Sequence, residues 1–205
     1  MNNRKRFLLA GLLTAISALF GMVSHADAQD PAEIVKSTTE QVLRALRDEG
    51  ATADKQKIYA IVEQMVLPHF DFRKMSQWVL GKNWKQGSPQ EQERFVEEFQ
   101  RLLVRTYSTA LTEYTDQEIN YLPTKEDDEG KIATVKTEVI QPNGGGTIPI
   151  DYRLYTRDGE WKVFDVWVNG ASLVTTYRTS FNEQVSTKGF SGMVEDLAAH
   201  NHTNQ

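Results

Sequence analysis

The sequence predicts an α+β fold with a helical N-terminal half, an antiparallel four-stranded meander sheet and C-terminal helices. Three successive patterns along the chain support this prediction. Apolar residues recur every three or four positions up to about residue 115, alternate in short runs from 117 to 168, and return to the helical period after residue 170. The 205 residues contain no internal repeat and no linker, so we expect residues 29–199 to form one domain.

The first 28 residues are predicted to be a cleaved signal peptide. Basic residues at positions 4–6 precede an uncharged, mostly apolar run over 7–23, and two small-x-small cleavage sites end at Ala26 and Ala28. An uncleaved anchor is the alternative, since roughly 17 apolar residues is the lower limit for spanning a bilayer. Cleavage would change the net charge from −5 to −7, because it removes three basic residues and one acid. We then expect a soluble protein in the periplasm.

Helices before the sheet are predicted over residues 31–49, 53–66, 72–80 and 89–115. Capping signals support their starts: Asp30 precedes the first helix, Asp71 precedes the third, and a Ser88–Glu91 capping box opens the fourth. Pro68 and Gly81 end the second and third helices. After the sheet, helices are predicted over 171–184 and 191–199, and residues 200–205 are expected to be a flexible tail.

Strands are predicted over residues 117–122, 131–140, 147–156 and 160–168, joined by short turns. The last of these strands is unusual, because apolar residues occupy both of its faces. Phe164, Val166 and Val168 alternate with an equally apolar set at Trp161, Val163 and Trp167. Both faces therefore need cover. The pattern alone leaves open whether protein covers both faces or whether one of them lines a ligand cavity.

The chain offers few groups for catalysis or metal binding. It has no cysteine, and His69 is the one histidine away from the signal and the tail, so a zinc site is not expected. The net charge of −5 argues against nucleic-acid binding. Ser172 lacks the second glycine of a nucleophile elbow. No set of residues assembles an active site, and we expect no enzymatic activity.

Asp165 is an acid between two apolar residues of the last strand. A buried carboxylate is costly unless a cation or hydrogen-bond donors meet it. Arg178 lies in the helix that follows and must fold back on this strand. We expect Asp165 and Arg178 to form a structural polar pair.

Three stretches of the chain occur in a recognisable order. They are HFDF followed by MS and VLGKNW within 69–84, FVEEF with LVRTY within 95–107, and GEWKVFDV running into GASLV and YR within 159–178. Together they resemble the MlaC family, the periplasmic phospholipid-binding proteins of the Mla lipid-transport system, also called toluene-tolerance proteins. The resemblance extends from about Ile34 to Leu197. Trp167 and Asn169 depart from the family's pattern, because a smaller residue and an acid are expected there.

The resemblance implies a periplasmic carrier that binds a phospholipid by its acyl chains and shuttles it between the two membranes, which maintains outer-membrane lipid asymmetry. The tails would lie in an apolar cavity between sheet and helices, as cargo and not as a cofactor. The implied partners are an outer-membrane lipoprotein–porin complex and an inner-membrane ABC transporter with a lipid-binding ring. We expect a monomer that binds no metal and does not itself span the membrane.

The expected lining of this cavity combines the apolar faces of two helices and two strands. It consists of Leu103, Tyr107, Leu111, Ile148, Ile150, Tyr152, Val166, Val168, Val174, Tyr177 and Phe181. Two other classes stay open. One is an enzyme on an NTF2-like α+β fold with Asp165 or His69 as base, and the other is a protein-only adaptor with a solid core.

Overall fold

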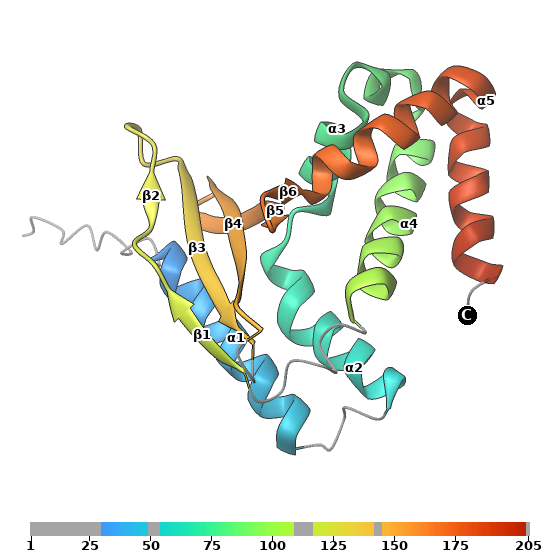
Figure 1. Ribbon diagram of the computed structural model, residues 1–205. Coiled ribbons are helices and arrows are strands. Elements are labelled where there is room, and N and C mark those ends of the chain that lie inside the picture. The colour runs from blue at the N-terminus through green and yellow to red at the C-terminus, as the bar shows by residue number, and fades with distance from the viewer. Residues whose placement is uncertain (1–29, 49–53, 109–116, 142–144, 204–205) are drawn as a thin grey trace, which may run out of the picture.

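The computed structural model describes residues 30–48, 54–108, 117–141 and 145–203. The predicted signal peptide lies outside these residues. The chain has the predicted α+β fold, with the sheet on one side and a layer of helices on the other (Figure 1). Among the described residues, no helix is both long and apolar enough to cross a membrane.

In the described part of the chain, seven helical segments of different types precede the sheet. They are α1 (Pro31–Asp48), α2 (Lys55–Ile61), the π-helical η2 (Val62–Val66), the 3-10 helix η3 (Leu67–His69), α3 (Phe72–Leu80), the 3-10 helix η4 (Gly81–Gln86) and α4 (Pro89–Ser108). The helix predicted over 53–66 is thus α2 continued by a wider turn. The expected end of the long helix, residues 109–116, lies outside the described residues.

The predicted caps are confirmed. Asp71 Oδ1 accepts a hydrogen bond from the Lys74 amide at 2.8 Å, which caps α3. Ser88 and Glu91 form the predicted capping box, since the Ser88 amide donates to Glu91 Oε2 at 2.8 Å and the Glu91 amide donates to Ser88 Oγ at 3.3 Å. Both caps join residues three positions apart, which is why the sequence reveals them.

The sheet is antiparallel, with strand order β1-β3-β4-β5-β6. Its strands are β1 (Glu118–Tyr121), β2 (Lys125–Glu126), β3 (Ile132–Ile140), β4 (Thr147–Arg157), β5 (Glu160–Val168) and β6 (Ala171–Ser172). The four longer strands are the predicted ones. The two-residue strands β2 and β6 were not predicted, because two residues show no period. The edge of β3 pairs with both β1 and β2, and Pro123 between them has no N–H to donate to the sheet.

A β-bulge changes the prediction for β5. Arg153 is opposite Asp165, while the next residue, Leu154, is opposite Val163, so Phe164 is an extra residue on β5. The bulge puts Val163 on the same face as Val166, whereas strict alternation would separate them. Phe164 packs on the helices instead. Both sides of β5 are therefore in contact with protein over this stretch.

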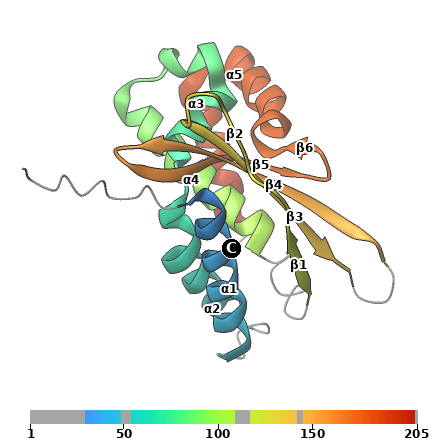
Figure 2. The same cartoon turned by 90° about the vertical axis from the view of Figure 1, so that its left-hand side faces the viewer.

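Helices α3, α4 and α5 pack on one another beside the sheet (Figures 1 and 2). Buried apolar side chains form two main clusters, one among these helices and one on the sheet. The helical cluster consists of Phe72, Met75, Val79, Leu80, Phe95, Val96, Phe99, Leu103, Phe164, Val174, Phe181, Val185, Phe190, Met193, Val194 and Leu197. The sheet cluster consists of Ile34, Val35, Ala133, Val135, Leu154, Trp161, Val163 and Val166. A smaller cluster joins α1 to α2 and η2.

The C-terminus differs from the prediction. Helix α5 (Leu173–Thr203) begins after β6 and takes the place of the two separate helices that were predicted over 171–184 and 191–199. It has a kink at Gly189, whose φ is 73°. Residues 200–203 are helical, so they are not the flexible tail that we expected. Asn201 is fully buried, and its Nδ2 donates to the backbone oxygen of Glu98 at 2.9 Å and to Glu98 Oε2 at 2.7 Å. This polar contact explains why a polar segment belongs to the fold.

Candidate apolar binding site

One face of the sheet is mostly apolar, and we call it the inner face. Residues directly opposite each other in an antiparallel sheet share a face. Three such rows cross the sheet: Tyr121–Thr137–Ile150–Val168, Val135–Tyr152–Val166 and Ala133–Leu154–Val163. Ile119, Val139 and Ile148 form a fourth row. The opposite side of the sheet is the outer face.

Helix α1 covers one end of the inner face. Ile34 and Val35 pack there against Ala133, Val135 and Leu154, all of them buried. Towards the other end, the inner-face side chains of Ile148, Ile150, Tyr152 and Val168 are only partly buried. An apolar surface that is half covered by its own protein is typical of a site that another apolar molecule completes.

On the longer strands β1, β3, β4 and β5, the inner face carries no acidic or basic side chain, and the exposed Glu126 on the short strand β2 lies opposite Ala133 at its edge. The polar side chains of this face on the longer strands are those of Tyr121, Thr137, Tyr152 and Thr156. Thr137 Oγ1 donates to the Ile150 carbonyl at 2.9 Å, which satisfies the hydroxyl. Burial raises the pKa of Tyr152 to about 12 and also raises the pKa of Tyr121. Both phenols therefore stay neutral, and the face suits hydrocarbon better than a charged ligand.

The structure separates the expected lining residues into two groups. Ile148, Ile150, Tyr152, Val166 and Val168 come together on the inner face, as their strand positions predict. The helix residues Leu103, Val174 and Phe181 are instead buried in the helical cluster, with Tyr177 packed against it. Tyr107 is exposed near the end of α4, and Leu111 lies outside the described residues.

Aromatic packing explains where the helix residues lie. The ring of Phe181 is 5.2 Å from that of Phe95 and 5.8 Å from that of Phe99, both edge-on. Tyr177 is edge-on to Phe99 at 5.5 Å, and it shares a hydrogen bond with Tyr107. The apolar stripes of α4 and α5 thus pack on each other. A helical period identifies such stripes but not their partners.

The expected pair of Asp165 and Arg178 does not form. Asp165 is buried, and it accepts hydrogen bonds from Trp167 Nε1 at 2.8 Å, Ser172 Oγ at 2.8 Å and the Val174 amide at 3.2 Å. Arg178 is exposed, and its guanidinium lies against Gly81 at the end of α3. Three donors replace the cation because β6 returns the chain to β5 and brings the first turn of α5 to the carboxylate.

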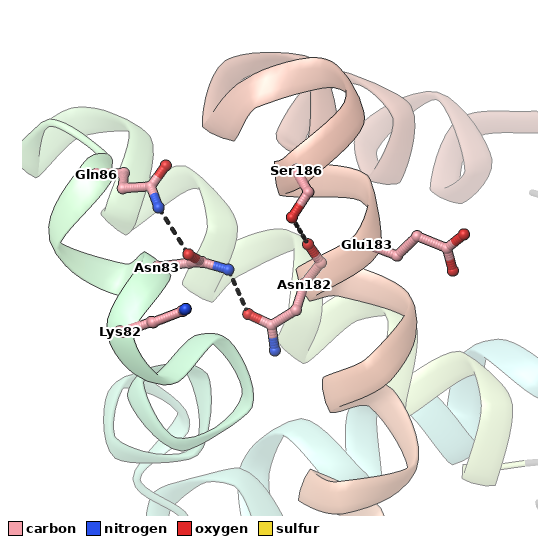
Figure 3. Close-up of a pocket in the computed structure, with 6 residues that line it drawn as sticks. All are labelled: Lys82, Asn83, Gln86, Asn182, Glu183 and Ser186. Carbon is pink, nitrogen blue, oxygen red and sulfur yellow. Dashed lines mark hydrogen bonds between the residues drawn. The ribbon is translucent and has the colours of Figure 1, made fainter.

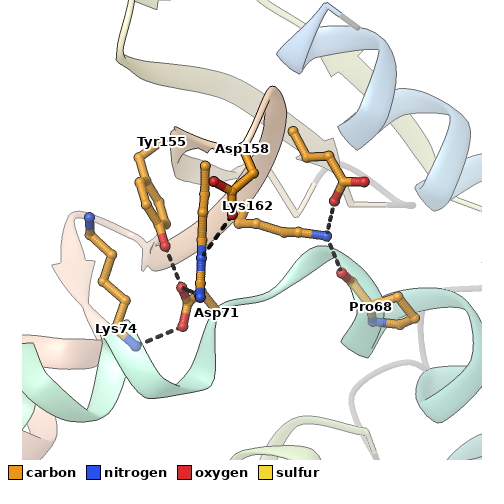
Figure 4. Close-up of polar contacts among 8 residues, drawn as sticks. Pro68, Asp71, Lys74, Tyr155, Asp158 and Lys162 are labelled. Atoms are coloured by element: carbon orange, nitrogen blue, oxygen red, sulfur yellow. Dashed lines mark hydrogen bonds and ion pairs between the residues drawn. The ribbon is translucent and has the colours of Figure 1, made fainter. Parts of the chain in front are cut away.

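A second buried acid, Asp71, joins α3 to the sheet (Figure 4). Its Oδ2 accepts hydrogen bonds from the Tyr155 hydroxyl and from Arg157 Nη1, the latter at 3.1 Å, and its amide donates to the Val163 carbonyl at 2.9 Å. Burial alone would raise the pKa of Asp71, but hydrogen bonds from Tyr155, the Lys74 amide and Arg157 outweigh it and lower that pKa. The sequence indicated only that Asp71 caps α3, because Tyr155 and Arg157 lie on a distant hairpin.

A depression of about 600 Å³ lies between η4 and α5 (Figure 3). Asn83 Nδ2 donates to Asn182 Oδ1 at 2.6 Å, and Gln86 Nε2 donates to Asn83 Oδ1 at 2.6 Å. Lys82, Glu183 and Ser186 complete a polar lining. This chain of amides joins the two elements, and its polarity does not suit an acyl chain.

The described residues hold no group of three or more acidic or histidine side chains that could bind a metal ion. A mostly apolar sheet face, covered by a helix at one end and partly open at the other, defines a protein that binds an apolar ligand. The chain belongs to the MlaC family, since the family model described as MlaC protein matches residues 36–199.

Known proteins similar to the chain agree with this membership. The toluene tolerance protein ttg2D of Pseudomonas putida is 32% identical over 185 residues, which are 89% of this chain and 84% of that protein. The intermembrane phospholipid transport system binding protein MlaC of Haemophilus influenzae is 30% identical over 123 residues, which are 59% of this chain and 58% of that protein.

A solved structure supports the fold. The phospholipid-binding protein from Ralstonia solanacearum, in complex with a phospholipid, matches with a TM-score of 0.76 and 29% sequence identity. The match covers 84% of this chain and 97% of that chain.

Proposed function

We propose that this chain is a carrier that binds a phospholipid by its acyl chains and moves it between membranes. The partly open inner face of the sheet is the observation that carries the proposal. The bound phospholipid of the Ralstonia solanacearum relative supports it. The phospholipid is cargo, and the chain is not an enzyme.

Physical chemistry explains why such a carrier is needed. Two acyl chains contain about 30 CH₂ groups, and each costs about 0.8 kcal/mol to expose, so a free lipid in water costs about 25 kcal/mol. The protein must replace most of this burial and still release the lipid. A face that is already half covered by α1 suits this balance, because the protein stays folded when the lipid leaves.

The proposed site begins with the inner-face residues Ile148, Ile150, Tyr152, Val166 and Val168. The acyl chains lie against these side chains, and the head group faces water. Tyr107, near the end of α4, and Leu111, which lies outside the described residues, stay proposed as lining residues. The other expected residues would support the site from within the helical cluster. They are Leu103, Val174, Tyr177 and Phe181.

The cellular compartment is proposed from the predicted signal peptide. Export by the signal peptide of residues 1–28, followed by cleavage, would release residues 29–205 into the periplasm. There the carrier would exchange lipid with an outer-membrane lipoprotein–porin complex and an inner-membrane ABC transporter with a lipid-binding ring, and so maintain outer-membrane lipid asymmetry. It would do so as a monomer.

Mass spectrometry of an organic extract tests the proposal. The chain is purified without detergent from a periplasmic fraction, and an unrelated exported protein is prepared in parallel as the control. We expect glycerophospholipid in the extract of the chain and none above background in the control. Equal, background amounts in both extracts would contradict carriage and favour a protein-only adaptor.

A further inference from the structure

Tyr152 places a phenol in the middle of the inner face, in one row with Val135 and Val166. Its neighbours along the strand on this face are Ile150 and Leu154. The side chain is partly buried, and its hydroxyl makes no hydrogen bond within the described parts of the chain. A hydrogen-bonding group thus lies among apolar side chains that offer it no acceptor.

Two neighbouring hydroxyls of the inner face do have partners within the protein. Thr137 Oγ1 donates to the Ile150 carbonyl at 2.9 Å. The Tyr121 hydroxyl shares a hydrogen bond with the side chain of Thr39 on α1. These two groups are satisfied whether or not a ligand is bound, whereas the Tyr152 hydroxyl is available to a ligand.

A ligand that covers the inner face changes the surroundings of this hydroxyl. A partly buried hydroxyl can hydrogen-bond to water, but an apolar ligand that lies over it excludes the water. A hydrocarbon chain offers no acceptor in exchange, so the hydroxyl would lose its hydrogen bonds, which opposes binding. A ligand that binds well over Tyr152 is therefore one that combines hydrocarbon with a hydrogen-bond acceptor at this point.

A phospholipid carries acceptors in two places: the neutral ester carbonyls, where the acyl chains join the glycerol, and the charged phosphate beyond them. The phosphate does not suit this part of the face, because the longer strands present no basic side chain there. Burial and the nearby acids Glu40 and Glu33 of α1 raise the pKa of Tyr121, so the field beside Tyr152 is negative. An ester carbonyl is neutral and accepts a hydrogen bond from a neutral phenol.

We infer that the Tyr152 hydroxyl donates a hydrogen bond to an ester carbonyl of the bound phospholipid, so that this chain selects ester-linked over ether-linked lipids. The inference rests on the proposed carrier function and names what the site recognises besides hydrocarbon. An ether-linked lipid has the same chains and head group but lacks the carbonyl oxygen. The hydrogen bond also sets how deep the lipid lies, because the ester group is a fixed point between the chains and the head group.

Lipid uptake from mixed vesicles tests the inference. The purified chain is incubated with vesicles that contain equal amounts of dipalmitoyl phosphatidylglycerol and its dihexadecyl ether analogue, which share the head group and the number of chain carbons. The protein is then separated from the vesicles, and mass spectrometry of its organic extract gives the ratio of the two lipids. We expect the wild type to take up the ester lipid in about five-fold excess, the effect of one ordinary hydrogen bond. We expect Tyr152→Phe to take up the two lipids equally.

Tyr121→Phe is the matched control, because it removes a phenol hydroxyl of the same face that already has a partner, and we expect it to keep the ester preference. Equal uptake of the two lipids by the wild type would overturn the inference and leave carriage intact, and this outcome needs no variant to fold. An ester preference that survives in Tyr152→Phe would overturn it as well. Uptake of neither lipid by the wild type would overturn the carrier function and the inference together.

Discussion

Ser172 Oγ donates a 2.8 Å hydrogen bond to Asp165 Oδ2, and Asp165 Oδ1 accepts another from the Val174 amide at 3.2 Å. Ser172 Oγ in turn accepts from the Thr175 amide at 3.0 Å. The strand carboxylate and the serine thus cap the first turn of α5 together, where the helix dipole favours negative charge. This contact fixes the point at which the sheet joins the helical layer.

Removing the Asp165 carboxylate is expected to destabilise the fold. In Asp165→Ala, the hydroxyl of Ser172 and the Val174 amide lose their acceptor in a buried place, which costs about 2–4 kcal/mol in unfolding free energy. Arg178→Gln should change it by less than about 0.5 kcal/mol, because Arg178 is exposed. Urea denaturation of the single and double variants checks this. Strong coupling between the two substitutions would contradict the independence of Asp165 and Arg178.

Asp71 is expected to contribute stability that depends on pH. Its pKa in the folded state lies below the ordinary value of 3.8, so the folded protein binds a proton there less readily than the unfolded chain does. The contribution is complete above pH 3.8 and is lost as the pH falls through the lowered pKa. The difference in unfolding free energy between the wild type and Asp71→Asn should therefore shrink below about pH 4. A difference that is constant down to pH 2 would show that ionisation of Asp71 does not matter.

Tyr155→Phe is expected to lower the unfolding free energy by about 1.5–3 kcal/mol, because it removes a hydrogen bond to a charged and buried acceptor. Thr156→Val is a matched control on the neighbouring position. Thermal denaturation with far-UV circular dichroism at pH 7 measures both. A Tyr155→Phe variant as stable as the wild type would mean that Arg157 and the Lys74 amide suffice to hold Asp71.

Ile150→Glu is expected to abolish lipid retention. A carboxylate on the inner face is incompatible with a hydrocarbon neighbour, whereas the partly buried position leaves the side chain access to water when no lipid is bound. Ile140→Glu is the matched control, because Ile140 is also partly buried but lies on the outer face. Phospholipid in organic extracts and melting temperature are measured together. Simultaneous loss of lipid and folding in Ile150→Glu alone would favour a packed core at this position.

Asn201→Ala is expected to destabilise the protein by about 1–3 kcal/mol, because Glu98 loses a buried donor to its carboxylate and to its backbone oxygen. Thr203→Ala, on the exposed side of the same helix end, should change the unfolding free energy by less than about 0.5 kcal/mol. Equal effects of the two substitutions would restore the expectation of a flexible tail.

Features that depend on near neighbours along the chain could be predicted from the residues alone. The caps at Asp71 and at Ser88–Glu91 join residues three positions apart, and the four long strands follow from alternation within each segment. The order of three short stretches was sufficient to indicate the MlaC family. The inner-face group around Ile150 also follows from strand positions, because residues on one face of a strand recur every second position.

Contacts between segments that are distant in the sequence could be identified only in the folded chain. Tyr155 meets Asp71 from 84 positions away, and Asn201 meets Glu98 from 103 positions away. Because of the β-bulge, the side chain of Phe164 packs in the helical cluster and not in the sheet cluster. The apolar stripe of α5 around Phe181 packs against α4. The physical reason is that a local period fixes which side chains share a face, whereas the partner of that face is chosen by packing and hydrogen bonding across the whole fold.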